Sequence, residues 1–176
     1  IITTNNRLWL SRTLLHLVKK VSFIFGLQNR FCMNYFVDES HCEIEEKNLF
    51  TAIELSSLKA VSGKKHYLHL MEENLWRKKF LPNGYRPFFD SEQIDENDSI
   101  IKSAIEWLLN PFGSQLNRYL MNFTDRKWRK KWRRKNYPMK DYDLAFKTTL
   151  HHSKNHPANY QKRVLSKMED FKTSKA

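Results

Sequence analysis

The sequence predicts a predominantly helical α+β fold, in which the remnant of a small mixed sheet and its helices is followed by a basic helical domain. Apolar residues recur at helical spacing in several long stretches. Two short stretches, residues 1–4 and 29–37, are instead dense in β-branched or aromatic residues, as buried strands are. Only 4 glycines in 176 residues argue against an all-β fold and against Gly-rich phosphate loops.

The first expected elements are a strand end, a helix and a second strand. Residues 1–4 lead into a helix over residues 7–25, with Asn5 or Asn6 as its N-cap and Gly26 as its C-terminal stop. The strand at 29–37 ends at the turn residues 38–40. Because the chain opens on a strand, without an initiator Met or a signal peptide, we expect the rest of that sheet upstream of Ile1, together with much of any chemistry.

Two amphipathic helices are expected next, at residues 47–61 and 64–80, joined near Ser62 and Gly63. Proline and glycine residues then break the chain, and residues 90–98 are acidic with almost no apolar side chains. We therefore predict an acidic linker at 84–98. It would separate residues 1–83, part of an α/β domain, from residues 99–176, a basic helical domain.

The last third of the sequence reads as helical. A helix is expected from Ser99 to Leu109, and another from Ser114. Trp128 and Trp132 lie roughly a third of a turn from the apolar stripe of that second helix, so a new helix capped near residues 124–125 is expected. A short segment at 142–150 and a final helix at 157–171 complete the chain.

Composition bears on partners and compartment. Lys and Arg total 31 against 19 Asp and Glu, and the resulting charge of +12 favours nucleic acid, nucleotides or an acidic membrane surface, although a basic protein without a polyanion partner has the same composition. Two cysteines, Cys32 and Cys42, are too few for a disulfide framework and favour a reduced, cytoplasmic setting. The longest apolar stretch, residues 14–27, is interrupted by polar and charged residues, so no transmembrane segment is expected.

A run of cations interleaved with two tryptophans is the most conspicuous local signal. On a helix the two indoles share a face and the cations surround them. The run could hold a phosphate backbone with the indoles stacked on bases, or lie on anionic lipid, or use the indoles as core anchors beneath a solvated charged face. The candidate polyanion-binding residues are Arg126, Lys127, Trp128, Arg129, Lys130, Lys131, Trp132, Arg133, Arg134 and Lys135.

Three histidines near the C-terminus, His151, His152 and His156, suggest metal ligands at first sight. No carboxylate or thiolate lies at a matching short spacing, so we do not predict a metal site there. Cys32 and Cys42 lack the C-x-x-C spacing and are expected to be buried fillers. No serine stands in a nucleophile-elbow context.

Four segments together resemble a family of predicted nucleotidyltransferases of the polymerase-β-like superfamily. They are residues 7–12 (Arg-Leu-Trp-Leu-Ser-Arg), 30–36 (Arg-Phe-Cys-Met-Asn-Tyr-Phe), 48–54 (Asn-Leu-Phe-Thr-Ala-Ile-Glu) and 74–83, which opens on Asn-Leu-Trp and closes on Leu-Pro-Asn. The resemblance covers residues 1–83 most clearly, and residues 156–165 also look similar. It implies that residues 1–83 are the C-terminal part of a nucleotidyltransferase-like domain.

The resemblance implies a site that this sequence carries only in part. The superfamily has a Gly-Ser pair, an Asp-x-Asp on the next strand and a third acidic residue on a later strand, which hold Mg²⁺ for transfer from a nucleoside triphosphate. The Gly-Ser pair and the Asp-x-Asp are absent here and would lie just upstream of Ile1. The later strand has Asn34 at the acidic position, so Asn34, or Asp38 in its place, is the candidate metal ligand. Arg7 and Arg12 are candidate phosphate ligands, or ordinary surface charges.

Two functions follow as expectations. The leading one is the C-terminal part of a Mg²⁺-dependent nucleotidyltransferase acting on an unknown acceptor, inactive without the missing carboxylates. The alternative is a non-enzymatic basic helical module that binds RNA or DNA.

Overall fold

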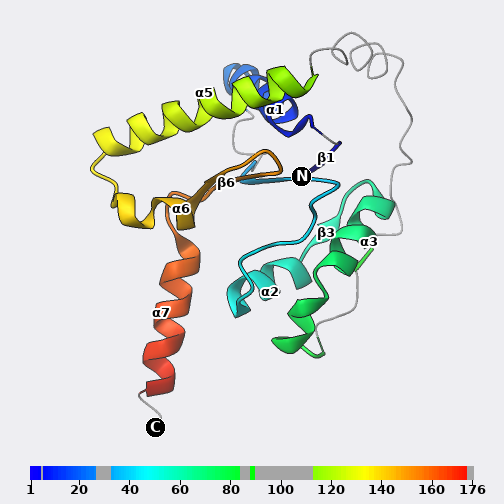
Figure 1. The fold of residues 1–176 in the computed structure, drawn as a ribbon. Coiled ribbons are helices and arrows are strands. Elements are labelled where there is room, and N and C mark those ends of the chain that lie inside the picture. Colours follow the sequence, from blue (N-terminus) through cyan, green and yellow to red (C-terminus); the bar gives the residue numbers. More distant parts are fainter. Residues whose placement is uncertain (5, 27–32, 84–87, 90–112, 174–176) are drawn as a thin grey trace. The chain divides into compact units, whose positions relative to one another are not determined.

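The protein was analysed as a computed structural model, which describes residues 1–4, 6–26, 33–83, 88–89 and 113–173. It forms two compact units, each built from two stretches of chain. Unit 1 comprises residues 1–41 and 99–158, and unit 2 comprises residues 42–98 and 159–176. The predominantly helical α+β class expected from the sequence is confirmed (Figure 1).

Unit 1 is built on a mixed four-stranded sheet with the order β1-β2-β6-β5. β1 (Ile2–Thr3) pairs in parallel with β2 (Tyr35–Asp38), as the strand-like ends of the predicted stretches indicate. β2 pairs antiparallel with β6 (His152–Asn155), which in turn pairs antiparallel with β5 (Phe146–Thr148). The strands β5 and β6 were not expected, because polar residues such as Lys147 and Lys154 mask their pattern.

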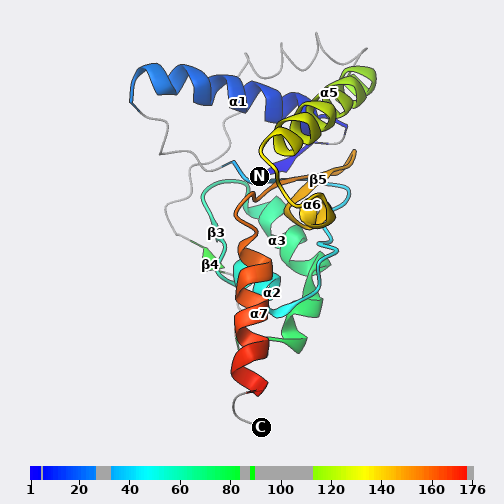
Figure 2. The same cartoon turned by 90° about the vertical axis from the view of Figure 1, so that its left-hand side faces the viewer.

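Two long helices, which are in contact and cross each other, cover one face of this sheet (Figures 1 and 2). α1 (Leu8–Ile24) matches the predicted helix, although its N-cap is Arg7 and not an asparagine. Its backbone N–H at Trp9 is satisfied by Asn117 Oδ1 of α5 (Gly113–Arg134), at 2.7 Å. The buried residues between helix and sheet are Leu8, Trp9, Met33 and Phe36, with Leu15, Leu120 and Met121 packed against them.

α5 is one continuous helix, so the predicted break at residues 124–125 is wrong. The apolar residues change face along α5 because the helix contacts different neighbours along its length. Leu120 and Met121 pack with α1, whereas Trp128 and Trp132 pack on a second cluster around Phe146. Asp125 does not cap a helix; its carboxylate accepts hydrogen bonds from Arg129 Nε and from Thr148 Oγ1.

The second cluster of unit 1 closes the end of the sheet beneath α5. A 3₁₀ turn, η4 (Met139–Asp141), leads into the short helix α6 (Tyr142–Ala145), and the chain continues directly into β5. The buried side chains Tyr142, Ala145 and Phe146 form its centre.

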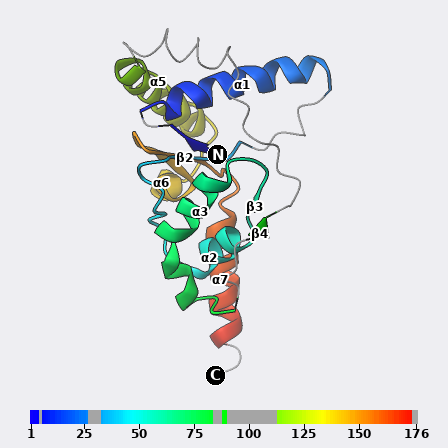
Figure 3. The same cartoon turned by 90° about the vertical axis from the view of Figure 1, so that its right-hand side faces the viewer.

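Unit 2 is mainly helical (Figure 3). It contains α2 (Leu49–Ser56), α3 (Lys64–Glu73), the 3₁₀ helix η2 (Leu75–Lys79), α7 (Tyr160–Thr173) and a parallel pair of strands, β3 (Lys59–Ala60) and β4 (Phe88–Phe89). The predicted helix 64–80 ends at Glu73 because Asn74 turns inward. Its amide accepts from Ile44 N and donates to the carbonyls of Cys42 and Leu70.

The structure divides the chain differently from the predicted domains 1–83 and 99–176. One sheet joins β1 and β2 from the first stretch to β5 and β6 from the second, because β2 and β6 pair across more than a hundred residues. Of the predicted linker 84–98, only residues 88–89 are described, and the predicted helix 99–109 lies outside the described residues. No helix of the described residues is both long and apolar enough to cross a membrane.

Candidate functional site

Asp38 is a buried carboxylate at the carboxyl end of β2, fully shielded from solvent. Its Oδ2 accepts a hydrogen bond from the backbone N–H of Asn6, at 3.1 Å, and its Oδ1 accepts from the backbone N–H and the hydroxyl of Ser40, at 3.0 and 2.8 Å. Burial alone would raise the pKa of Asp38, but these hydrogen bonds, together with one from His151, outweigh burial and lower it. The site therefore holds a preorganised negative charge at neutral pH.

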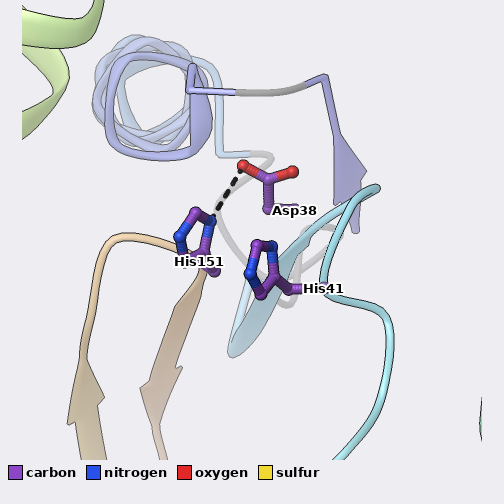
Figure 4. A group of neighbouring side chains, drawn as sticks. All are labelled: Asp38, His41 and His151. Carbon is purple, nitrogen blue, oxygen red and sulfur yellow. Dashed lines mark hydrogen bonds and ion pairs between the residues drawn. The ribbon is translucent and has the colours of Figure 1, made fainter.

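Two histidines lie beside this carboxylate (Figure 4). His151 is in the turn between β5 and β6, where the backbone N–H of Asp38 donates to its carbonyl at 2.9 Å. Its Nδ1 is 3.4 Å from Asp38 Oδ2. The ring of His41, from the turn after β2, stacks on the ring of His151 with centroids 3.6 Å apart and planes 13° apart.

One potential ligand atom from each of Asp38, His41 and His151 lies within 4.8 Å of the other two. The two imidazoles offer nitrogen and the carboxylate offers oxygen, which is a donor set for divalent transition metals. Mg²⁺ prefers oxygen ligands and retained water, so this set does not fit the Mg²⁺ that the resemblance implies.

The predicted metal ligands Asn34 and Asp38, which are alternatives for one position, lie at opposite ends of β2. Four residues along an extended strand separate them by about 13 Å, which is too far for both to contact one ion. The three C-terminal histidines do not cluster either. His152 is buried on β6 with its ring edge-on to Tyr35, at 6.5 Å between centroids, and only His151 joins the Asp38 group.

The predicted phosphate ligands Arg7 and Arg12 have different environments. Arg7 is the half-buried N-cap of α1. Arg12 is 2% exposed, and its guanidinium carbon lies 4.7 Å from the ring centroid of Trp128 and 5.0 Å from that of Phe36. Burial lowers the pKa of Arg12 to about 10. The structure thus encloses Arg12 among aromatic rings instead of presenting it at a surface.

The predicted polyanion-binding run occupies the second half of α5. Trp128 contacts Trp9 and Phe146, at 6.5 and 5.9 Å between ring centroids, and Trp132 lies 5.1 Å from Phe146. Both indoles therefore anchor the helix to unit 1, as one of the sequence alternatives has it. Arg129 bonds to Asp125 and Asp143. The remaining cations, which we call the basic surface, are all exposed: Arg126, Lys127, Lys130, Lys131, Arg133, Arg134 and Lys135.

Sequence reasoning missed His41 and Ser40, although both closely follow Asp38, and it treated His151 only as a neighbour of His152 and His156. The signal that unites them is the β2 and β6 pairing, which places Val37 opposite His152. It also missed Tyr119 and Phe123, which belong to the expected apolar stripe but are 65% and 53% exposed.

Comparisons with protein-family models, with curated proteins and with solved structures found no match to this chain. Functional conclusions therefore depend on the residues and geometry described above and on the sequence resemblance.

Proposed function

We propose that this chain is the C-terminal part of a nucleotidyltransferase-like protein, which uses Mg²⁺ to transfer a nucleotidyl group from a nucleoside triphosphate to an acceptor. The sequence resemblance over residues 1–83 motivates the proposal. The structural observation that supports it is the parallel register of β1 and β2, because this register favours one of the two candidate ligands as the partner of a carboxylate pair upstream of Ile1.

In this register the amino group of Ile1 donates to the Tyr35 carbonyl, and Val37 N–H donates to the Ile1 carbonyl, both at 3.0 Å. A strand continued upstream of Ile1 would run beside the residues that precede Tyr35. An Asp-x-Asp on that strand would be level with Asn34, whereas Asp38 would be at the opposite end of β2. The register therefore favours Asn34 over Asp38 as the later-strand ligand of the proposed site.

Under this proposal, residues of this chain help to hold and orient the metal-bound triphosphate, and the upstream carboxylates supply most of the negative charge that binds Mg²⁺. Bound Mg²⁺ would neutralise the triphosphate and align it for in-line attack. Asn34 would contribute a neutral carbonyl oxygen, and Arg7, at the start of the helix that leaves β1, is the phosphate ligand that stays near the surface. Arg12, enclosed by aromatic rings, has no such role.

The test is to read the coding sequence upstream of Ile1 and to assay the correspondingly extended protein. We expect Gly-Ser and Asp-x-Asp in frame, Mg²⁺-dependent incorporation of labelled nucleotide by the extended protein, and none by the 176-residue chain. Asn34→Ala should lower the extended protein's activity by about 10- to 100-fold, while Asn122→Ala, an exposed change on α5, should not. Absence of both upstream motifs, or incorporation by the 176-residue chain, would overturn the proposal.

A second candidate function, nucleic-acid binding, is favoured by the basic surface. The only acidic residue of α5 is Asp125, which is already bonded to Arg129, so no carboxylate of the same helix neutralises the exposed cations. The tryptophans are not available for stacking on bases. Tyr119 and Phe123 are exposed, and their rings stack with centroids 6.5 Å apart and planes 17° apart. They offer an alternative stacking platform for bases, one to two helical turns from the basic surface.

Fluorescence anisotropy with a labelled single-stranded RNA tests this second function. Binding should weaken steeply with salt, and each charge removed by Lys130→Gln or Arg134→Gln should reduce the slope of log K against log salt by roughly 0.7. Phe123→Ala should weaken binding without changing that slope, and Lys65→Gln on α3 is the control for loss of one exposed charge. Salt-independent binding, or stronger binding to anionic vesicles than to RNA, would exclude this function.

A further inference from the structure

We propose that Asp38, His41 and His151 bind a divalent transition-metal ion of the zinc type, at a site separate from the Mg²⁺ position of the proposed function. All three side chains belong to unit 1, and they come from the end of β2, the following turn and the β5 to β6 turn (Figure 4). The proposal rests on three features of this group: its donor spacing, the hydrogen bonds that orient its rings, and its open side.

The spacing of the donors matches a metal site. Ligand atoms about 2.1 Å from a tetrahedral zinc ion lie about 3.4 Å from one another. His151 Nδ1 and Asp38 Oδ2 are 3.4 Å apart, which equals this spacing. The rings of His41 and His151 are stacked, with centroids 3.6 Å apart and planes 13° apart, so their nitrogen lone pairs lie in nearly parallel planes. For both imidazoles to bind one ion, the exposed His41 side chain must rotate out of this stack, so that its lone pair points at the ion held by Asp38 and His151.

Ser40 fixes which nitrogen His41 offers. The Ser40 hydroxyl donates its one proton to Asp38 Oδ1, at 2.8 Å. It also lies 2.8 Å from His41 Nδ1, and in that contact it must accept, so Nδ1 carries a proton. A neutral His41 ring then has its free lone pair on Nε2, available for the metal. Metal-bound histidines commonly have such a partner on the second nitrogen, which sets the tautomer and the ring orientation.

Asp38 is prepared to be the charged ligand. Ser40 donates to Oδ1, the backbone N–H of Asn6 donates to Oδ2, and His151 Nδ1 lies 3.4 Å from the same Oδ2. Because the carboxylate is buried and fixed by backbone donors, binding an ion requires little reordering of this side chain.

One side of the group is open to solvent. His41 is exposed and the His151 side chain is 29% exposed. Three protein ligands with a remaining accessible position are typical of zinc sites that keep water or a substrate, in contrast to closed structural sites with four protein ligands. We therefore assign the site to an exchangeable, solvent-accessible ion.

The experiment is titration of the purified, chelator-treated chain with Zn²⁺ by calorimetry, and with Co²⁺ by visible absorption. We expect one ion per chain and a Co²⁺ spectrum with nitrogen ligation. His41→Gln is the main variant, because its exposed side chain is dispensable for packing, and it should weaken binding by about 100-fold or more. Ser40→Ala, which removes only the orienting hydroxyl, should weaken binding by about 10- to 100-fold.

His69→Gln is the matched control, since it removes an exposed imidazole from α3, outside the group. Circular dichroism of each variant establishes that the fold is retained. Equal affinity in the wild type and His41→Gln, or an equal loss in His69→Gln, would overturn the site. Failure here leaves the nucleotidyltransferase proposal standing, because that proposal depends on Asn34 and on residues upstream of Ile1.

Discussion

Replacing Arg12 by methionine tests how much its buried charge contributes to the stability of the fold. The guanidinium is 2% exposed, and neither terminal nitrogen has a hydrogen-bond partner in the part of the chain that the structure describes. Three aromatic rings surround it, with centroids at 4.7 Å for Trp128, 5.0 Å for Phe36 and 5.9 Å for Trp9. The three rings are therefore the stabilising contacts that the structure gives this charge.

The two opposing terms are of similar size. A pKa that falls from 12.5 to about 10 corresponds to a cost of about 3 kcal/mol for keeping the buried charge. Three cation–π contacts at about 1 kcal/mol each return about 3 kcal/mol. Arg12→Met removes both terms and fills most of the volume with a side chain that packs well on rings, so the free energy of unfolding should change by less than about 1 kcal/mol. Arg12→Ala leaves a cavity and should destabilise by about 2–4 kcal/mol.

Urea unfolding followed by near-ultraviolet circular dichroism is the appropriate assay, because Trp9 and Trp128 contact the substituted side chain. The informative quantity is the difference in the free energy of unfolding between the methionine and alanine variants. If Arg12→Met loses as much stability as Arg12→Ala, the charge itself stabilises the fold, and the reasoning that treats it as balanced is refuted.

Three further predictions concern single polar side chains. Burial and nearby cations lower the pKa of His16 to about 4, so between pH 6.5 and 4 the unfolded chain takes up a proton that the folded chain does not. The free energy of unfolding should therefore fall on acidification through this window. His16→Gln should flatten that part of a pH series of urea unfolding curves. Asn117→Ala leaves the N–H of Trp9 unsatisfied at the start of α1 and should cost about 1–3 kcal/mol in thermal unfolding, whereas Asn122→Ala should cost almost nothing. Asn74→Ala removes three buried hydrogen bonds of unit 2 and should lower its stability by at least about 2 kcal/mol, which hydrogen exchange at Ile44 would report.

Local sequence patterns predicted the elements that local forces determine. The helical spacing of residues 7–25 predicted α1. The density of apolar residues at 1–4 and at 29–37 predicted β1 and β2. The pattern of apolar residues gave a wrong prediction where the packing partner changes along one helix. In α5 the apolar face rotates because the first half packs on α1 and the second half on Phe146, and a change of face resembles a new helix when only the sequence is read.

The candidate site shows the same limit. Asp38 could be proposed because the family resemblance requires an acidic residue near the predicted strand 29–37, which it follows directly. Its partnership with His151, however, spans 113 residues and exists only through the β2 and β6 register. The strand β6 and its neighbour β5 are difficult to predict. β5 is only three residues long, and β6 consists largely of polar residues, of which His152, Ser153 and Lys154 are buried. Burial of polar side chains depends on the assembled unit, which no local pattern encodes.

The two metal proposals use opposite ends of one strand, and this gives them separable consequences. Asn34 precedes β2 and Asp38 ends it, so about 13 Å of extended backbone lies between them. Substitutions further apart than about 10 Å, with no shared partner, usually have additive effects. Loss of Zn²⁺ binding in His41→Gln and loss of Mg²⁺-dependent transfer in Asn34→Ala should therefore be independent. A strong coupling between the two would mean that the strand itself shifts when either end is occupied, because no single ion can contact both.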